Sequence, residues 1–97
     1  MVARSKIPLA TGSQYGLSIS STVVTLTVPA AADAAELYVR TNPIVFTRNV
    51  TDPTATAGTQ ANPGDIIVLD SRSQCERFEA IRQSADATVD VEYFRYA

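Results

Sequence analysis

The chain has 97 residues, of which 45% are hydrophobic and 19% charged, so its composition predicts one small globular domain and not a disordered segment. Eight Lys and Arg side chains oppose ten Asp and Glu side chains, for a net charge of −2. This balance does not indicate the clustered basic surface that binds nucleic acid. The absence of histidine and the single cysteine exclude an intramolecular disulfide, a cysteine-rich metal site and the usual general base of enzymes.

Membrane insertion and export are also disfavoured. The longest strongly apolar run is residues 66–69, Ile-Ile-Val-Leu, far short of the roughly 18–20 residues of a membrane-spanning helix. The N-terminus has a basic start but lacks the continuous apolar core of a signal peptide. We therefore expect a protein made in a cytoplasm, with neither a membrane nor nucleic acid among its partners.

The N-terminal stretch, residues 1–16, is predicted to be an arm. It mixes proline, glycine and small polar side chains with little periodicity, and domain ends are commonly disordered unless they are tied down. Arg4 and Lys6 lie in it without any acidic residue. The arm is therefore either a frayed terminus or a basic extension that attaches the remaining domain, residues 17–97, to an acidic partner.

The first predicted strands are residues 17–20 and 23–28. In the second run, apolar residues alternate with threonine, which is typical of a half-buried strand. Pro29 ends this run. The alanine-rich residues 30–35 favour a helix by propensity alone, but the run is too short for more than one turn, so we expect a corner between two strands.

Residues 37–40 and 44–48 are predicted to form a pair of short strands around which the rest of the domain is organised. Leu37 and Val39 alternate with polar or aromatic neighbours, the two-residue period of a strand. Pro43 interrupts the pattern because it cannot donate a ladder hydrogen bond. The second run then continues with β-branched and aromatic residues.

A long loop is predicted over residues 49–64. Its proline, glycine and asparagine residues form turns, and the threonine and alanine residues between them cannot build a core. Loops of this length in a small domain are often functional. The following residues 65–69 are apolar on both faces, so we expect a central strand covered on each side.

One helical turn is predicted near residues 71–76. Ser73 and Glu76 have the spacing of a capping box, and Asp70 or Ser71 could also cap the turn.

Two further strands complete the prediction. Residues 78–82 fit a helix or a strand, and the short connection to the next element favours a strand. Residues 87–96 alternate most regularly of all, and their acidic side chains could pair with Arg40, Arg48 or Arg82. About seven short strands at regular spacing indicate an all-β fold, a small antiparallel β-sandwich or jelly roll.

No catalytic constellation is found in the sequence. The serine and threonine hydroxyls have no evident activating base. Asp65 and Asp70 flank one strand about 16 Å apart and cannot act together, and Asp90 with Glu92 fits a solvated strand face. Cys75 is expected to be a passive, partly buried thiol. We therefore expect no enzyme activity, no metal site and no cofactor.

Contacts with a partner are instead expected from the arm, from the long loop and from tyrosine, a residue enriched at protein interfaces. The side chains predicted to make these contacts are Arg4, Lys6, Tyr15, Asn49, Asp52, Thr54, Thr56 and Gln60.

The order of these features is similar to that of a known group of proteins. The most specific segments are residues 52–58, Asp-Pro-Thr-Ala-Thr-Ala-Gly, and residues 78–82, Phe-Glu-Ala-Ile-Arg. A threonine-rich strand ending in Val-Pro, an alanine-rich corner and a Pro-Gly-Asp turn accompany them. Over about residues 22–95, the chain resembles the small β-sandwich proteins encoded among the structural genes of tailed bacteriophages.

The resemblance implies a non-enzymatic virion component, made in the host cytoplasm, that decorates or cements the capsid. Its partners would be the major capsid protein or other virion proteins, and further copies of itself. One alternative is a head-to-tail connector, collar or fibre-anchoring protein of the same fold. Another class is a carbohydrate-binding β-sandwich, although the chain has no tryptophan, four tyrosines and three phenylalanines.

Overall fold

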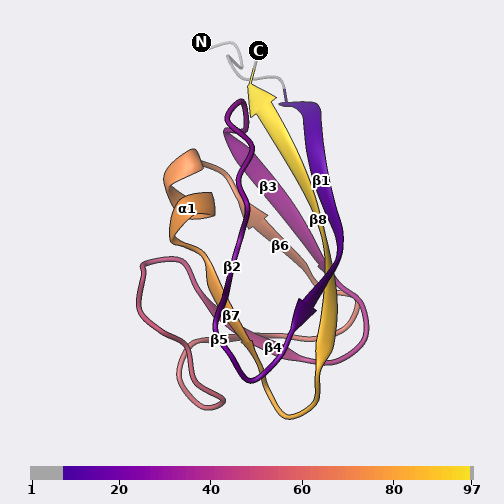
Figure 1. Ribbon diagram of the computed structural model, residues 1–97, viewed down its shortest axis with the longest axis vertical. Coiled ribbons are helices and arrows are strands. Elements are labelled where there is room, and N and C mark those ends of the chain that lie inside the picture. The colour runs from indigo at the N-terminus through magenta and orange to yellow at the C-terminus, as the bar shows by residue number, and fades with distance from the viewer. Residues whose placement is uncertain (1–7, 97) are drawn as a thin grey trace, which may run out of the picture.

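Residues 8–96, which the computed structural model describes, form two antiparallel four-stranded sheets packed face to face (Figure 1). The strands of sheet A are, in spatial order, β1 (Pro8–Ile19), β8 (Ala87–Tyr96), β3 (Ala34–Val39) and β6 (Ile66–Leu69). Those of sheet B are β2 (Val24–Thr25), β7 (Glu79–Arg82), β4 (Ile44–Thr47) and β5 (Thr59–Ala61). The predicted all-β antiparallel sandwich is confirmed, with eight strands where the sequence predicted about seven.

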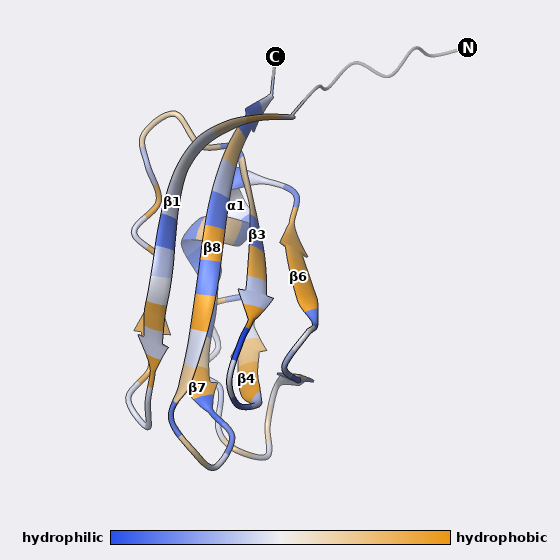
Figure 2. Ribbon diagram, turned by 90° about the vertical axis from the view of Figure 1, so that its right-hand side faces the viewer, coloured by the Kyte–Doolittle hydropathy of each residue, from blue (hydrophilic) through white to orange (hydrophobic). Residues whose placement is uncertain are grey.

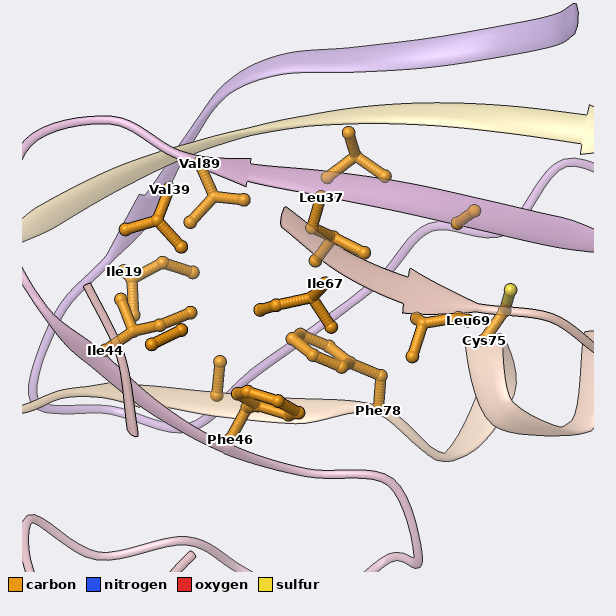
Figure 3. Close-up of a cluster of buried hydrophobic side chains, with 14 of the residues drawn as sticks. Ile19, Leu37, Val39, Ile44, Phe46, Ile67, Leu69, Cys75, Phe78 and Val89 are labelled. Carbon is orange, nitrogen blue, oxygen red and sulfur yellow. The ribbon is translucent and has the colours of Figure 1, made fainter. Parts of the chain in front are cut away.

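The core lies between the two sheets and follows from strand alternation. Val89, Val91 and Tyr93 of β8 point inward and are at most 1% exposed. Opposite them, Phe46 of β4 and Phe78 stack with ring centroids 5.6 Å apart (Figure 3). Burying this apolar surface on both inner faces is the main favourable term of folding.

Strand β2 is much shorter than the run predicted for residues 23–28. Only Val24 and Thr25 pair with β7, while Leu26 and Val28 pack against the core without belonging to a strand. The alternation in the sequence reports which side chains face the core, and it does not require a neighbouring strand along the whole run.

Helix α1 (Arg72–Arg77) confirms the predicted helical turn and holds the alanine-rich corner. The side chain of Ser71 caps it by accepting the Gln74 N–H, so the cap is not Ser73. The Arg72 guanidinium donates to the carbonyl oxygens of Pro29 and Ala32 at 2.8 and 2.7 Å. These bonds satisfy backbone carbonyls that no strand pairing reaches.

The prediction of an arm is wrong for residues 8–16, which belong to β1. This strand pairs with β8 from Pro8↔Tyr96 to Ile19↔Ala87, with two register shifts on the way. A backbone ladder needs no apolar alternation, and glycine at Gly12 and Gly16 accommodates the irregular geometry beside the shifts. Arg4 and Lys6 lie outside the described residues.

Strand β6 is not the central strand that its sequence predicted. It pairs only with β3 and forms the edge of sheet A. Ile66 and Val68 are 58% and 52% exposed on the outer face. Figure 2 shows this strand at the free edge of the sheet, strongly hydrophobic along its length.

Candidate functional site

The residues predicted to contact a partner do not form a single site. Tyr15 lies on β1 in sheet A, and Gln60 lies on β5 in sheet B. The remaining described ones lie together in the connection between β4 and β5, namely Asn49, Asp52, Thr54 and Thr56. The structure therefore offers two separate surfaces, one on the outer face of each sheet.

The connection between β4 and β5, residues 48–58, covers the outer face of sheet B. Val45 alternates with the inward-facing Ile44 and Phe46 and lies outside the core cluster, yet it is only 2% exposed. The backbone of Gly58 packs so tightly on Val45 that a Cβ there would lie 2.7 Å from Val45 Cγ1. Pro53 is also buried. We name residues 49–58 the covering loop, because its base is packed on the sheet.

The tip of the covering loop is a fixed turn with exposed side chains. Thr54 and Ala57 exchange two backbone hydrogen bonds, of 2.9 and 3.2 Å. All four residues from Thr54 to Ala57 are exposed. At the base, Asn49 Oδ1 accepts the Thr51 N–H at 3.2 Å. The loop therefore presents the hydroxyl and methyl groups of Thr54 and Thr56 from a rigid base, which lowers the entropic cost of a contact there.

Asp52 of the covering loop lies beside Glu79 of β7. The pKa of Glu79 is raised above its ordinary value by a hydrogen bond with the Asp52 carboxyl, and further by burial and by the Asp52 charge. Glu79 Oε1 is buried and has no partner when both groups are ionised, since neither carboxylate then carries a proton. When one of the two carboxyls is protonated it donates a hydrogen bond to the other, and this bond fastens the covering loop to β7.

This pair makes stability depend on pH. The folded state holds the Glu79 proton more tightly than the unfolded state, so the free energy of unfolding falls as pH rises from about 4.5 through the raised pKa. Glu79→Gln should abolish this fall and raise the neutral-pH stability by about 1 kcal/mol, because the amide donates permanently to Asp52.

Urea titrations of both proteins at a series of pH values measure the effect. Glu76→Gln is the matched control, since Glu76 forms an exposed ion pair with Arg72 at 3.0 Å and should change little. An unchanged pH dependence in Glu79→Gln would contradict the hydrogen bond between the two carboxyls.

The outer face of sheet A carries two tyrosines and two glutamates in contact. Glu36 and Glu92 lie directly opposite each other on β3 and β8, an unfavourable pairing of like charges. Tyr38 donates to Glu36 at 2.6 Å, and Tyr15 donates to Glu92 at 3.0 Å. The Tyr38 hydroxyl also lies 3.2 Å from a Glu92 oxygen, so it bridges the two carboxylates. The pKa of each tyrosine is raised first by its bonded glutamate, Tyr38 by Glu36 and Tyr15 by Glu92. Tyr15 is therefore held in place despite its 65% exposure.

Asp90 ties β1 to this face. Gly16 has a φ of 70° beside the second register shift of β1, and its N–H donates to Asp90 Oδ1 at 2.8 Å. Arg40 donates to the other carboxylate oxygen at 2.9 Å. The Gly16 N–H and then Arg40 lower the pKa of Asp90, as a carboxylate with two donors requires. The pairing of an acidic β8 side chain with Arg40 is as predicted.

Cys75 is buried in α1, and burial raises the pKa of its thiol to about 11. It is therefore a protonated core side chain at neutral pH and the poor nucleophile that was predicted, although it is fully buried and not partly buried as expected. Between residues 8 and 96, no group of three or more His, Cys, Asp and Glu side chains is arranged to hold a metal ion. Within the same residues, no helix is long and apolar enough to cross a membrane.

Sequence reasoning missed Glu36 and Glu79 as members of these surfaces, whereas Tyr38 was among the tyrosines expected at a binding surface. Their alternation marks them as outward-facing, but the strand register decides which of them meet. The two faces present hydroxyl, methyl, tyrosine and carboxylate groups that are suited to non-covalent contacts. In comparisons with known proteins, no family model, no curated protein and no solved structure matches this chain.

Proposed function

We propose that the chain is a non-enzymatic structural protein of a tailed-phage virion that binds the assembled capsid as a decoration or cement protein. One observation carries the proposal furthest. The two segments with the most specific resemblance, residues 52–58 and 78–82, are distant in sequence but meet in space. Asp52 of the first segment lies beside Glu79 of the second, and just before each segment Val50 N–H donates to the Arg77 carbonyl oxygen at 3.4 Å.

The covering loop is the proposed contact. Its tip is exposed while its base is fixed to sheet B, so a capsid surface would meet a preformed shape. Stabilisation of the capsid then follows from mass action, because a domain that binds only the assembled lattice favours it in proportion to occupancy and affinity. The partner is the major capsid protein or another virion protein, and no cofactor takes part.

The copy number in purified phage particles tests the proposal. Quantitative mass spectrometry would compare this chain with the major capsid protein and the portal protein. A ratio near that of the capsid protein is expected for decoration. A ratio near that of the portal would replace it by the connector, collar or fibre-anchoring alternative, and absence from the particle would overturn both.

The contact is tested separately by a charge at the loop tip. Thr56→Lys should abolish binding to particles stripped of this protein, because an ammonium replaces a small hydroxyl in the contact. Ser84→Lys is the matched control, at an exposed residue of the connection between β7 and β8. Equal binding by the two variants would show that the loop tip is not the contact.

A further inference from the structure

Strand β6 is the edge strand with the least protection among residues 8–96. Edge strands are usually shielded by charge, proline, bulges or shortness. Strand β1 has two register shifts, β2 has two residues, and β5 has three. Strand β6 consists of four consecutive apolar residues in continuous register with β3. A second strand could pair with it once the long Arg48 contact with the Val68 carbonyl oxygen gives way.

The exposed side chains of β6 add an apolar surface to this edge. Ile66 and Val68 are two of the five large hydrophobic side chains that are exposed in the described part of the chain. They lie two residues apart on the same face of one strand. A hollow lined by Gln60, Ile66 and Val68 runs beside the strand, so the edge is open.

The free backbone groups of β6 have a defined spacing. Val39 N–H donates to the Asp65 carbonyl oxygen at 3.1 Å, and bonds to one neighbour recur at every second residue of an antiparallel strand. The N–H and C=O groups of Ile66 and Val68 therefore point away from β3. Arg48 confirms this direction, because it reaches the Val68 carbonyl oxygen from sheet B through one long bond of 3.4 Å.

We propose that β6 pairs antiparallel with β6 of a second copy of this chain, about a two-fold axis at Ile67. In this register Ile66 lies opposite Val68 of the second copy, and Val68 opposite its Ile66. All free N–H and C=O groups of both residues are then bonded, and the two sheets join into one of eight strands. The four outward side chains form a continuous apolar stripe.

Self-complementarity favours a second copy over another partner. The strand places apolar residues opposite apolar residues under two-fold symmetry, which is what an isologous contact requires. The Glu36 carboxylates of the two copies would be separated by at least three strand spacings, about 14 Å, which is beyond the screening length of about 8 Å at physiological salt. At either end of the pair, Asp65 would lie opposite Leu69 of the second copy, one residue away from its Asp70.

This charge arrangement predicts an unusual salt dependence. Screening the repulsion between Asp65 and Asp70 should strengthen self-association as salt is added, whereas a basic partner held by the acidic face would be weakened by salt. The paired segment is short compared with interfaces of standard size. We therefore expect a weak, reversible dimer that forms at high concentration, and this expectation does not depend on the proposed virion function.

Sedimentation equilibrium over a concentration series is the first test. The unaltered chain should show a monomer–dimer equilibrium that strengthens with salt, and Val68→Lys should weaken it at least tenfold. Val50→Lys is the matched control, because Val50 is equally apolar and 58% exposed on the covering loop. A chain that stays monomeric at every concentration and salt, or a dimer that persists unchanged in Val68→Lys, would overturn the proposal.

Two further experiments test the register of the paired strands and the role of the Val68 carbonyl oxygen. Ile66→Cys mixed with Val68→Cys should form a disulfide between copies faster than either variant alone, because only the mixed pair lies directly opposite. Arg48→Met should tighten the dimer at least twofold, since it frees the Val68 carbonyl and keeps an apolar side chain over the Phe46 ring. Equal crosslinking rates, or a dimer weakened by Arg48→Met, would contradict this pairing.

Discussion

Replacing Phe78 by alanine is expected to lower the free energy of unfolding by about 3–5 kcal/mol. Phe78 is 1% exposed at the junction of α1 and β7, and its ring stacks on Phe46 at an interplanar angle of 25°. Its removal leaves a cavity between two sheets that cannot close without disturbing both ladders. Because small domains have free energies of unfolding of about 5–15 kcal/mol, the variant should lose a large share of its total stability.

Urea unfolding followed by far-ultraviolet circular dichroism measures this loss. Phe94→Ala is the matched control, because the Phe94 ring lies on the outer face of sheet A and is only partly buried. Its removal creates no enclosed cavity, so its cost should be less than half that of Phe78→Ala. Equal losses would mean that Phe78 does not occupy the centre of the core.

Replacing Gly58 by alanine should destabilise the protein by about 2 kcal/mol or more. Gly58 has a φ of 133°, which a side chain strongly disfavours. A Cβ at this position would also lie 2.7 Å from Val45 Cγ1 and 3.0 Å from the Phe46 carbonyl oxygen. Both atoms belong to the sheet, so the covering loop would have to lift from β4.

Gly64→Ala separates backbone strain from this steric clash. Gly64 has a φ of 92°, but a Cβ there would meet no atom within 4 Å. We expect a loss of about 1 kcal/mol from strain alone, and chemical denaturation of the two variants gives the difference. Similar losses would contradict the packing of the loop on Val45.

Much of the fold could be predicted because strand alternation is a local signal. The inward-facing residues of β3 and β8, the helical turn and the strand after it all follow from spacing, propensity and capping. The segment of residues 87–96 was the clearest case. It forms β8, whose pairing with β3 is the longest ladder without a register shift. Such patterns depend on which face of a strand is buried, because buried positions are occupied by apolar residues and these are visible in the sequence.

Strand order and register could not be predicted in the same way. The apolar residues 66–69 read as a doubly covered strand, but β6 is an edge, because the number of strands beside a segment is a property of the whole sheet. Residues 8–16 read as an arm because their pairing with β8 uses backbone groups that every sequence possesses. The contact between the Asp52 and Glu79 carboxyls likewise needs a loop to fold onto a strand 27 positions later in the chain.

The amino-acid sequence alone determined an all-β domain and the inward faces of its main strands. These properties follow from composition and from short-range periodicity. Only the tertiary structure decided that the covering loop packs on Val45, that two tyrosines donate hydrogen bonds to two opposed glutamates, and that β6 has a free edge. Each of these depends on contacts between segments far apart in the chain, whose pairing arises when the two sheets pack.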